Sequence, residues 1–70
     1  MVFERVTLPV ARKIANLTQK GLAEKVGVSE STVYKWEKGY SEPTVSQAQM
    51  IADICERPLD SIIFLQSTTV

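Results

Sequence analysis

A turn of only three residues between two short amphipathic segments is the feature that most constrains the fold of this chain. Apolar residues recur at helical spacing from Gln19 to Val26, and Gly27 ends the pattern because glycine adopts the left-handed conformation without steric penalty. A second helical pattern begins after Ser29 and stops at Gly39. The two helices must therefore pack closely. The side chains that we expect between them and against the rest of the core are Leu22, Ala23, Val26, Val28, Val33 and Trp36.

Three further segments have helical spacing, Leu8–Ala15, Val45–Cys55 and Leu59 to about Phe64. Hydroxyl side chains precede four of the five predicted helices and can accept hydrogen bonds from their first free amides. These candidate N-caps are Thr7, Thr18, Ser29 and Thr44. The fourth helix is predicted to bury one stripe, formed by Val45, Ala48, Ile51, Ala52 and Cys55.

The two ends of the chain have weaker patterns. Val2–Val6 is a candidate strand, Phe64-Leu65 is its candidate partner, and residues 66–70 are expected to form a flexible tail. We therefore predict an all-α fold, a compact five-helix bundle that leaves room for a short terminal β-pairing. Seventy residues suit one domain over residues 1–70, with its core in residues 8–65.

Composition excludes several classes of function. The chain has one cysteine and no histidine, so an internal disulfide, a tetrahedral zinc site and a Ser–His or Cys–His nucleophile are not expected. A chain this short also has little volume for a closed substrate pocket. We therefore expect no enzyme, no metal and no cofactor. No apolar run approaches the ~18 residues of a membrane span, and no secretory signal is evident, so the expected compartment is the cytoplasm.

The charges of the chain sum to zero, which alone argues against a nucleic-acid binder. They are unevenly distributed, because residues 1–40 carry a net charge of +3 and residues 41–70 a net charge of −3. Such a chain can present one basic face. A chance division of sixteen charges between two halves explains the same numbers, and both interpretations stay open.

Two helices joined by a three-residue turn containing glycine are typical of a helix-turn-helix. The stretch LTQKGLAEKVGVSESTVYKWEKGYSEP, Leu17 to Pro43, resembles the phage repressor and Cro family of helix-turn-helix proteins. The resemblance extends over residues 8–63. It is carried by the spacing of Gln19, Ala23, Gly27, Val33, Trp36, Glu37, Gly39 and Pro43. It implies a five-helix bundle that binds operator DNA as a homodimer and controls transcription.

The resemblance also implies roles for single residues. Base edges would be contacted by Glu30, Ser31 and Lys35. The types are suitable, since a lysine donates to guanine, a glutamate accepts from cytosine and a serine does either. Phosphates would be contacted by Gln19, Thr32, Tyr34, Lys38, Tyr40 and Ser41. Gln19 would also brace the third helix, and Arg12 and Glu37 would form a structural pair between the first and third helices.

The chain departs from the family pattern at three places. Glu56-Arg57-Pro58 stands where the family often has Gly-Val-Ser, so that corner must pack differently. Gly21 weakens the second helix by about 1 kcal/mol relative to alanine. Glu30 brings a negative charge close to DNA.

Several residues allow two interpretations. Tyr34 is either a phosphate contact or a solvated ring. Trp36 and Cys55 are expected in the core, in preference to base stacking and a redox switch respectively. The apolar run Ile62–Leu65 either completes the core or contacts a second chain.

The predicted function is therefore sequence-specific binding of operator DNA through the third helix. The alternative is a small helix-turn-helix modulator that binds a larger repressor protein instead of DNA. The zero net charge and Glu30 favour this alternative.

Overall fold

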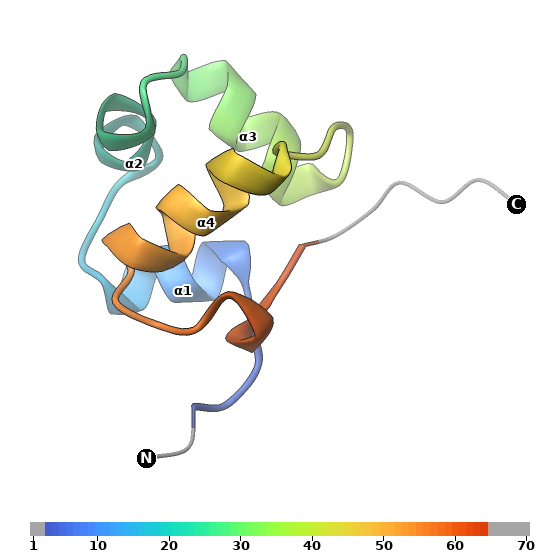
Figure 1. Ribbon diagram of the computed structural model, residues 1–70. Coiled ribbons are helices and arrows are strands. Elements are labelled where there is room, and N and C mark those ends of the chain that lie inside the picture. The colour runs from blue at the N-terminus through green and yellow to red at the C-terminus, as the bar shows by residue number, and fades with distance from the viewer. Residues whose placement is uncertain (1–2, 65–70) are drawn as a thin grey trace, which may run out of the picture.

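The computed structural model describes residues 3–64. Its elements, in chain order, are β1 (Val6–Thr7), α1 (Leu8–Ile14), α2 (Gln19–Val26), α3 (Glu30–Lys38), α4 (Val45–Ile54), the 3₁₀ turn η1 (Leu59–Ser61) and β2 (Ile62–Ile63). Helix α2 packs against both α3 and α4, and in Figure 1 α4 is seen between the α2–α3 pair and α1. The predicted tail, residues 66–70, lies outside the described residues, as do Val2 and Leu65 of the predicted strand pairing.

The helix starts follow from the predicted hydroxyl caps. Thr18 Oγ1 accepts from the amide of Gly21 at 2.9 Å, and Ser29 Oγ accepts from the amide of Thr32 at 3.2 Å. At the start of α4, Thr44 and Gln47 exchange side-chain to backbone hydrogen bonds of 2.9 and 3.1 Å, which is a capping box. Thr7 precedes α1, but its side chain makes no capping hydrogen bond. Three of the four predicted caps are thus confirmed.

Each of the four helices is followed, within two residues of its end, by a residue in the left-handed conformation. These residues are Asn16 (φ 61°), Gly27 (φ 89°), Gly39 (φ 79°) and Glu56 (φ 56°). In each case the amide of the next residue donates to a carbonyl in the last helical turn, as Arg57 N does to Ala52 O at 3.1 Å. A side chain in this conformation costs roughly 1–2 kcal/mol. Glu56 therefore strains the end of α4, at the position where the family often has glycine.

One hydrophobic cluster joins all four helices and β2. Its buried members are Leu8, Ala11, Leu22, Ala23, Val26, Val33, Trp36, Ile51, Ala52, Cys55 and Ile62. Of the six residues predicted to lie between α2 and α3, five are among them, and Val28 is partly buried against the cluster. Burial raises the pKa of the Cys55 thiol, which the nearby Arg57 guanidinium partly offsets. Cys55 is thus a buried core residue, as expected.

The prediction that Val45 is buried was wrong, because its side chain is 83% exposed. Val45 occupies the first position of α4 and lies on the same helix face as Ala52. Ala52 is fully buried and Ala48 is half-buried, so burial along this face decreases toward the start of the helix. The start of α4 therefore extends past the body of the protein.

The predicted fifth helix was also wrong. Only Leu59–Ser61 form a helical turn, and the chain then continues as β2, which pairs in parallel with β1 through Val6–Ile62 and Thr7–Ile63. Two consecutive β-branched isoleucines suit a strand better than a helix. The fold is therefore four helices with a two-stranded pairing of the chain ends, displaced from the residues predicted for it.

Arg57 shows how the departure from the family pattern is accommodated. Its guanidinium donates to the backbone carbonyl of Glu4 and, at 3.0 Å, to Ser61 Oγ. Its Cζ lies 5.3 Å from the centre of the Phe3 ring. Ser61 in turn donates to the Pro58 carbonyl at 2.7 Å. Arg57 thus connects the N-terminal segment to the turn before β2.

The helices among residues 3–64 are too short or too polar for any of them to cross a membrane.

Candidate nucleic-acid interface

Helix α3 has one buried face and one exposed face. Val33 and Trp36 are 0% and 3% exposed, and Glu37 is 7% exposed. The exposed side chains of the helix are Glu30, Ser31, Tyr34, Lys35 and Lys38. Ser31, Lys35 and Lys38 follow one another at intervals of four and three residues, so they form one stripe along the outer side. A nine-residue helix thus presents a continuous polar surface.

The helix that carries this stripe lies at one end of the molecule. Figure 1 shows α2 and α3 together at that end, joined by the short turn, with α1 at the opposite end. Val28 after Gly27 donates its amide to Ala23 O at 3.0 Å, which closes the turn over the end of α2. The packing of α2 on the inner face of α3 leaves the opposite face uncovered.

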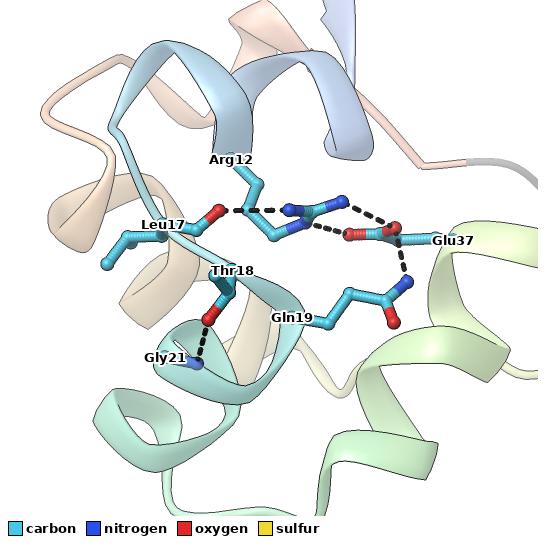
Figure 2. Close-up of polar contacts among 6 residues, drawn as sticks. All are labelled: Arg12, Leu17, Thr18, Gln19, Gly21 and Glu37. Carbon is cyan, nitrogen blue, oxygen red and sulfur yellow. Dashed lines mark hydrogen bonds and ion pairs between the residues drawn. The ribbon is translucent and has the colours of Figure 1, made fainter.

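A polar network fixes the orientation of α3. Glu37 accepts from Arg12 Nε at 2.6 Å, from Arg12 Nη2 at 3.3 Å and from Gln19 Nε2 at 2.9 Å. Arg12 Nη1 also donates to the Leu17 carbonyl at 2.9 Å. Figure 2 shows side chains from α1 and α2 converging on this one carboxylate of α3. The Arg12 and Glu37 side chains are only 11% and 6% exposed, so this bidentate pair is well shielded from water.

The candidate base-contacting residues occupy the exposed face. Glu30 and Ser31 lie in the first turn of α3, and Lys35 lies one turn further on. Ser31 Oγ is 3.1 Å from Ser29 Oγ, the cap of the helix. A hydroxyl has one donor and two acceptor positions, so Ser31 can keep this contact and still meet a base.

The candidate phosphate-contacting residues fall into two groups. Gln19 and Thr32 are half-buried and engaged within the protein, Gln19 with Glu37 and Thr32 Oγ1 with Ser29 Oγ at 2.9 Å. The exposed group lies on the second half of α3 and the residues that follow it, and consists of Tyr34, Lys38, Tyr40 and Ser41. The structure therefore brings four of the six to one end of α3.

An aromatic and cationic cluster at this end of α3 did not emerge from the sequence. The Tyr34 and Tyr40 rings lie edge to face, with centres 6.4 Å apart, and Lys38 Nζ lies 5.7 Å from the Tyr34 ring centre. The spacing of four residues between Tyr34 and Lys38 could have predicted the contact between these two side chains, because residues four apart are neighbours on a helix surface. The contact with Tyr40 depends on the path of the chain after Gly39.

The charges along α3 also suit the helix itself. Glu30 is in the first turn, and Lys35 and Lys38 are in the last turn. Each sign is stabilised there by the helix macrodipole. These charges are therefore compatible with a stable exposed helix even before any ligand binds.

Two grooves lie outside the exposed face of α3. Residues 3–64 contain no group of three His, Cys, Asp or Glu that could hold a metal ion. One groove is lined by Phe3, Ala52, Asp53, Glu56, Arg57 and Pro58. A second is lined by Glu42, Pro43, Thr44, Val45, Ala48, Leu59 and Phe64. Neither of these two grooves includes a candidate base or phosphate contact.

Comparison with known proteins agrees with this geometry. An uncharacterized HTH-type transcriptional regulator of Methanocaldococcus jannaschii is 46% identical over 41 residues, which cover 59% of this chain. The match spans 62% of the length of that relative. No solved structure gives a significant match. Residues 10–62 match the helix-turn-helix family over most of the chain. The chain therefore belongs to the helix-turn-helix family.

Proposed function

We propose that this chain is a DNA-binding transcription regulator that inserts the exposed face of α3 into the major groove. The observation that carries the proposal is the stripe of Ser31, Lys35 and Lys38 on a helix whose opposite face is fixed by the core and by the Arg12–Glu37 pair. The major groove, about 12 Å wide, admits one α-helix. A rigidly held helix loses little conformational freedom when it binds there.

Specificity and affinity are assigned to different side chains. Base edges are contacted by Glu30, Ser31 and Lys35, with Lys35 donating to guanine and Glu30 accepting from cytosine. Phosphates are contacted by Gln19, Thr32, Lys38, Tyr40 and Ser41. Tyr34, the sixth predicted phosphate contact, instead acts through its ring, which Lys38 and Tyr40 both contact. Gln19 reaches a phosphate only if it shares its amide with Glu37 or releases it, since the two are 2.9 Å apart.

The finer proposal is a regulator of the phage repressor and Cro type. Such a protein acts by occupying an operator as a homodimer, with half-sites about 34 Å apart.

Ile62 is buried and Ile63 and Phe64 are half-buried, so this run mostly completes the core. Val45, 83% exposed and next to Phe64 in the second groove, is the better candidate for contact with a second copy.

One observation favours the alternative, a modulator that binds a larger repressor protein. Glu30 is exposed at the start of α3, where a carboxylate repels phosphates. The chain as a whole has no net charge to attract DNA from a distance. In that case Glu30, Ser31, Tyr34 and Lys35 would contact a protein.

Selection of duplex DNA from a random pool by the purified chain tests the proposal. We expect one recurring sequence, protected from cleavage in a footprint, with affinity that falls steeply between about 50 mM and about 200 mM salt. Recovery of no preferred sequence, together with a stable complex between α3 and a repressor protein, would establish the alternative.

A further inference from the structure

We propose that Tyr34 is a positioning residue, whose aromatic ring holds the Lys38 ammonium and Tyr40 in place to meet the DNA backbone at the end of α3. The inference rests on the proposed function. It explains the contribution of Tyr34 to DNA binding by its aromatic ring, whereas a direct phosphate contact would be made by its hydroxyl group. The residues involved are all on or just after the second half of α3.

Both contacts of the Tyr34 ring have attractive geometry. Edge-to-face aromatic pairs have centres roughly 4.5–7 Å apart, and the Tyr34 and Tyr40 rings are 6.4 Å apart with an angle of 63° between their planes. A cation is attracted to a ring centre within about 6 Å, and Lys38 Nζ lies at 5.7 Å. One ring therefore touches both a cation and a second ring.

The end of α3 produces this arrangement. Gly39 takes the left-handed conformation with φ 79°, its amide donates to Trp36 O at 3.3 Å, and the Tyr40 amide donates to Lys35 O at 2.9 Å. These two bonds turn the chain back over the last turn of the helix. Tyr40 is thereby returned to Tyr34, six positions earlier in the chain, while Lys38 reaches the same ring from four residues along the helix.

The hydrophobic core does not require this cluster. Tyr34 is 43% exposed and Tyr40 is 68% exposed, and neither belongs to the core cluster. Lys38 is exposed as well. What the cluster does is restrict a lysine, whose long side chain would otherwise lose rotamer freedom on meeting a phosphate. Restricting it beforehand lowers the entropic cost of the phosphate contact.

Two substitutions distinguish the ring from the hydroxyl. Tyr34→Phe keeps the ring and removes the hydroxyl, whereas Tyr34→Leu removes the ring and keeps apolar bulk on the helix. If Tyr34 donated to a phosphate, both variants would bind DNA more weakly. If the ring positions Lys38, only Tyr34→Leu would do so.

The test uses the full chain and the duplex that the wild-type protein selects, over a range of salt concentrations. We expect Tyr34→Phe to match the wild type in affinity and in salt dependence. Tyr34→Leu should bind about two- to fivefold more weakly. In a Lys38→Ala background, the same Tyr34→Leu change should have little further effect, because the cation that the ring holds is already absent.

A second measurement needs no DNA. The Tyr34 ring should shift the Lys38 side-chain proton resonances upfield in the nuclear magnetic resonance spectrum of the free protein. We expect this shift in the wild type and in Tyr34→Phe, and its loss in Tyr34→Leu, with melting curves that show all three proteins fully folded at the temperature of the measurement.

The outcomes separate the two proposals. Equal weakening by Tyr34→Phe and Tyr34→Leu, an undiminished effect of Tyr34→Leu in the Lys38→Ala background, or no upfield shift in the wild type would each overturn the positioning role while leaving DNA binding intact. Failure of the wild type to bind any duplex would overturn the proposed function, and the positioning role with it.

Discussion

The two faces of α3 differ in how completely their side chains are partnered within the protein. On the inner face, Val33 and Trp36 are in the core and the Glu37 carboxylate accepts three hydrogen bonds. On the outer face, Lys35 and Lys38 are exposed to solvent. Both faces belong to the same nine residues, so under the proposed function α3 separates support from recognition. The inner face sets where the helix lies, and in our proposal the outer face sets what it can bind.

The comparison predicts two classes of variant. Changes on the inner face should lower the free energy of unfolding, and changes on the outer face should alter DNA binding at constant stability. An outer-face variant that changed the free energy of unfolding together with DNA binding would contradict this division between the two faces.

The largest effect is expected for Trp36→Ala. Removing this 3%-exposed side chain leaves a cavity between α2 and α3, which should cost about 3–5 kcal/mol of unfolding free energy. Urea denaturation followed by circular dichroism measures this loss. Lys35→Ala serves as the outer-face control and should change stability by no more than about 0.5 kcal/mol. A Trp36→Ala loss as small as that of the control would show that the inner face does not support the helix.

The Arg12–Glu37 pair should give the next largest effect. Arg12→Ala leaves the Glu37 carboxylate, 6% exposed, with Gln19 as its remaining partner, and should cost about 3 kcal/mol, the low end for breaking a buried pair. The double variant Arg12→Ala with Glu37→Ala should cost no more than either single change, because no charge is left stranded. Additive losses in a double-mutant cycle would mean that the pair is not coupled.

On the outer face, Lys35→Ala should change specificity. Loss of one base contact should cost about 1–3 kcal/mol on the selected duplex and relax the preference at one base pair. Binding to duplexes that each carry one altered base pair measures this. A uniform loss of affinity on every duplex would place Lys35 at a phosphate.

Lys38→Ala should weaken binding to all sequences alike. Loss of one phosphate contact should reduce the slope of log affinity against log salt concentration by about 0.9. Lys25→Ala is a matched control, since Lys25 is an exposed lysine in the last turn of α2 and belongs to neither predicted group of DNA contacts. Equal slopes for Lys38→Ala and the wild type would remove Lys38 from the interface.

The smallest effect is expected far from both faces. Glu56 has φ 56° at the end of α4, so Glu56→Gly should stabilise the protein by about 1 kcal/mol. Glu56→Ala removes the same charge without relieving the backbone and should give no such gain. DNA affinity should be unchanged in both variants. If DNA affinity rose together with stability in Glu56→Gly, DNA binding would depend on how much of the protein is folded. The proposed division of roles between the two faces of α3 would then be wrong.

Local signals explain what could be predicted from the sequence. The start and end of α3 depend on Ser29 and Gly39, whose effects act within one turn of the chain, and the structure places both where expected. The burial of Val33 and Trp36 follows from helical spacing. The contact of Arg12 with Glu37 was implied by resemblance to a family, because a separation of 25 residues carries no local signal.

Non-local contacts explain what could not be predicted. Leu59–Phe64 has helical spacing, but six residues cannot distinguish a helix from a strand, and the outcome depended on β1 at the other end of the chain. Val45 lies on the predicted face of α4, yet periodicity does not say where the neighbouring elements end. The Tyr34–Tyr40 contact required the chain path after Gly39.

The most direct test of the central claim is to map the amide resonances that shift when the selected duplex is added to the labelled chain. We predict the largest shifts at Ser31, Lys35 and Lys38, smaller shifts at Val33 and Trp36, and none at the buried Cys55 after α4. Shifts confined to the groove around Val45 and Phe64, or no shifts with any duplex, would contradict the assignment of DNA recognition to the outer face of α3.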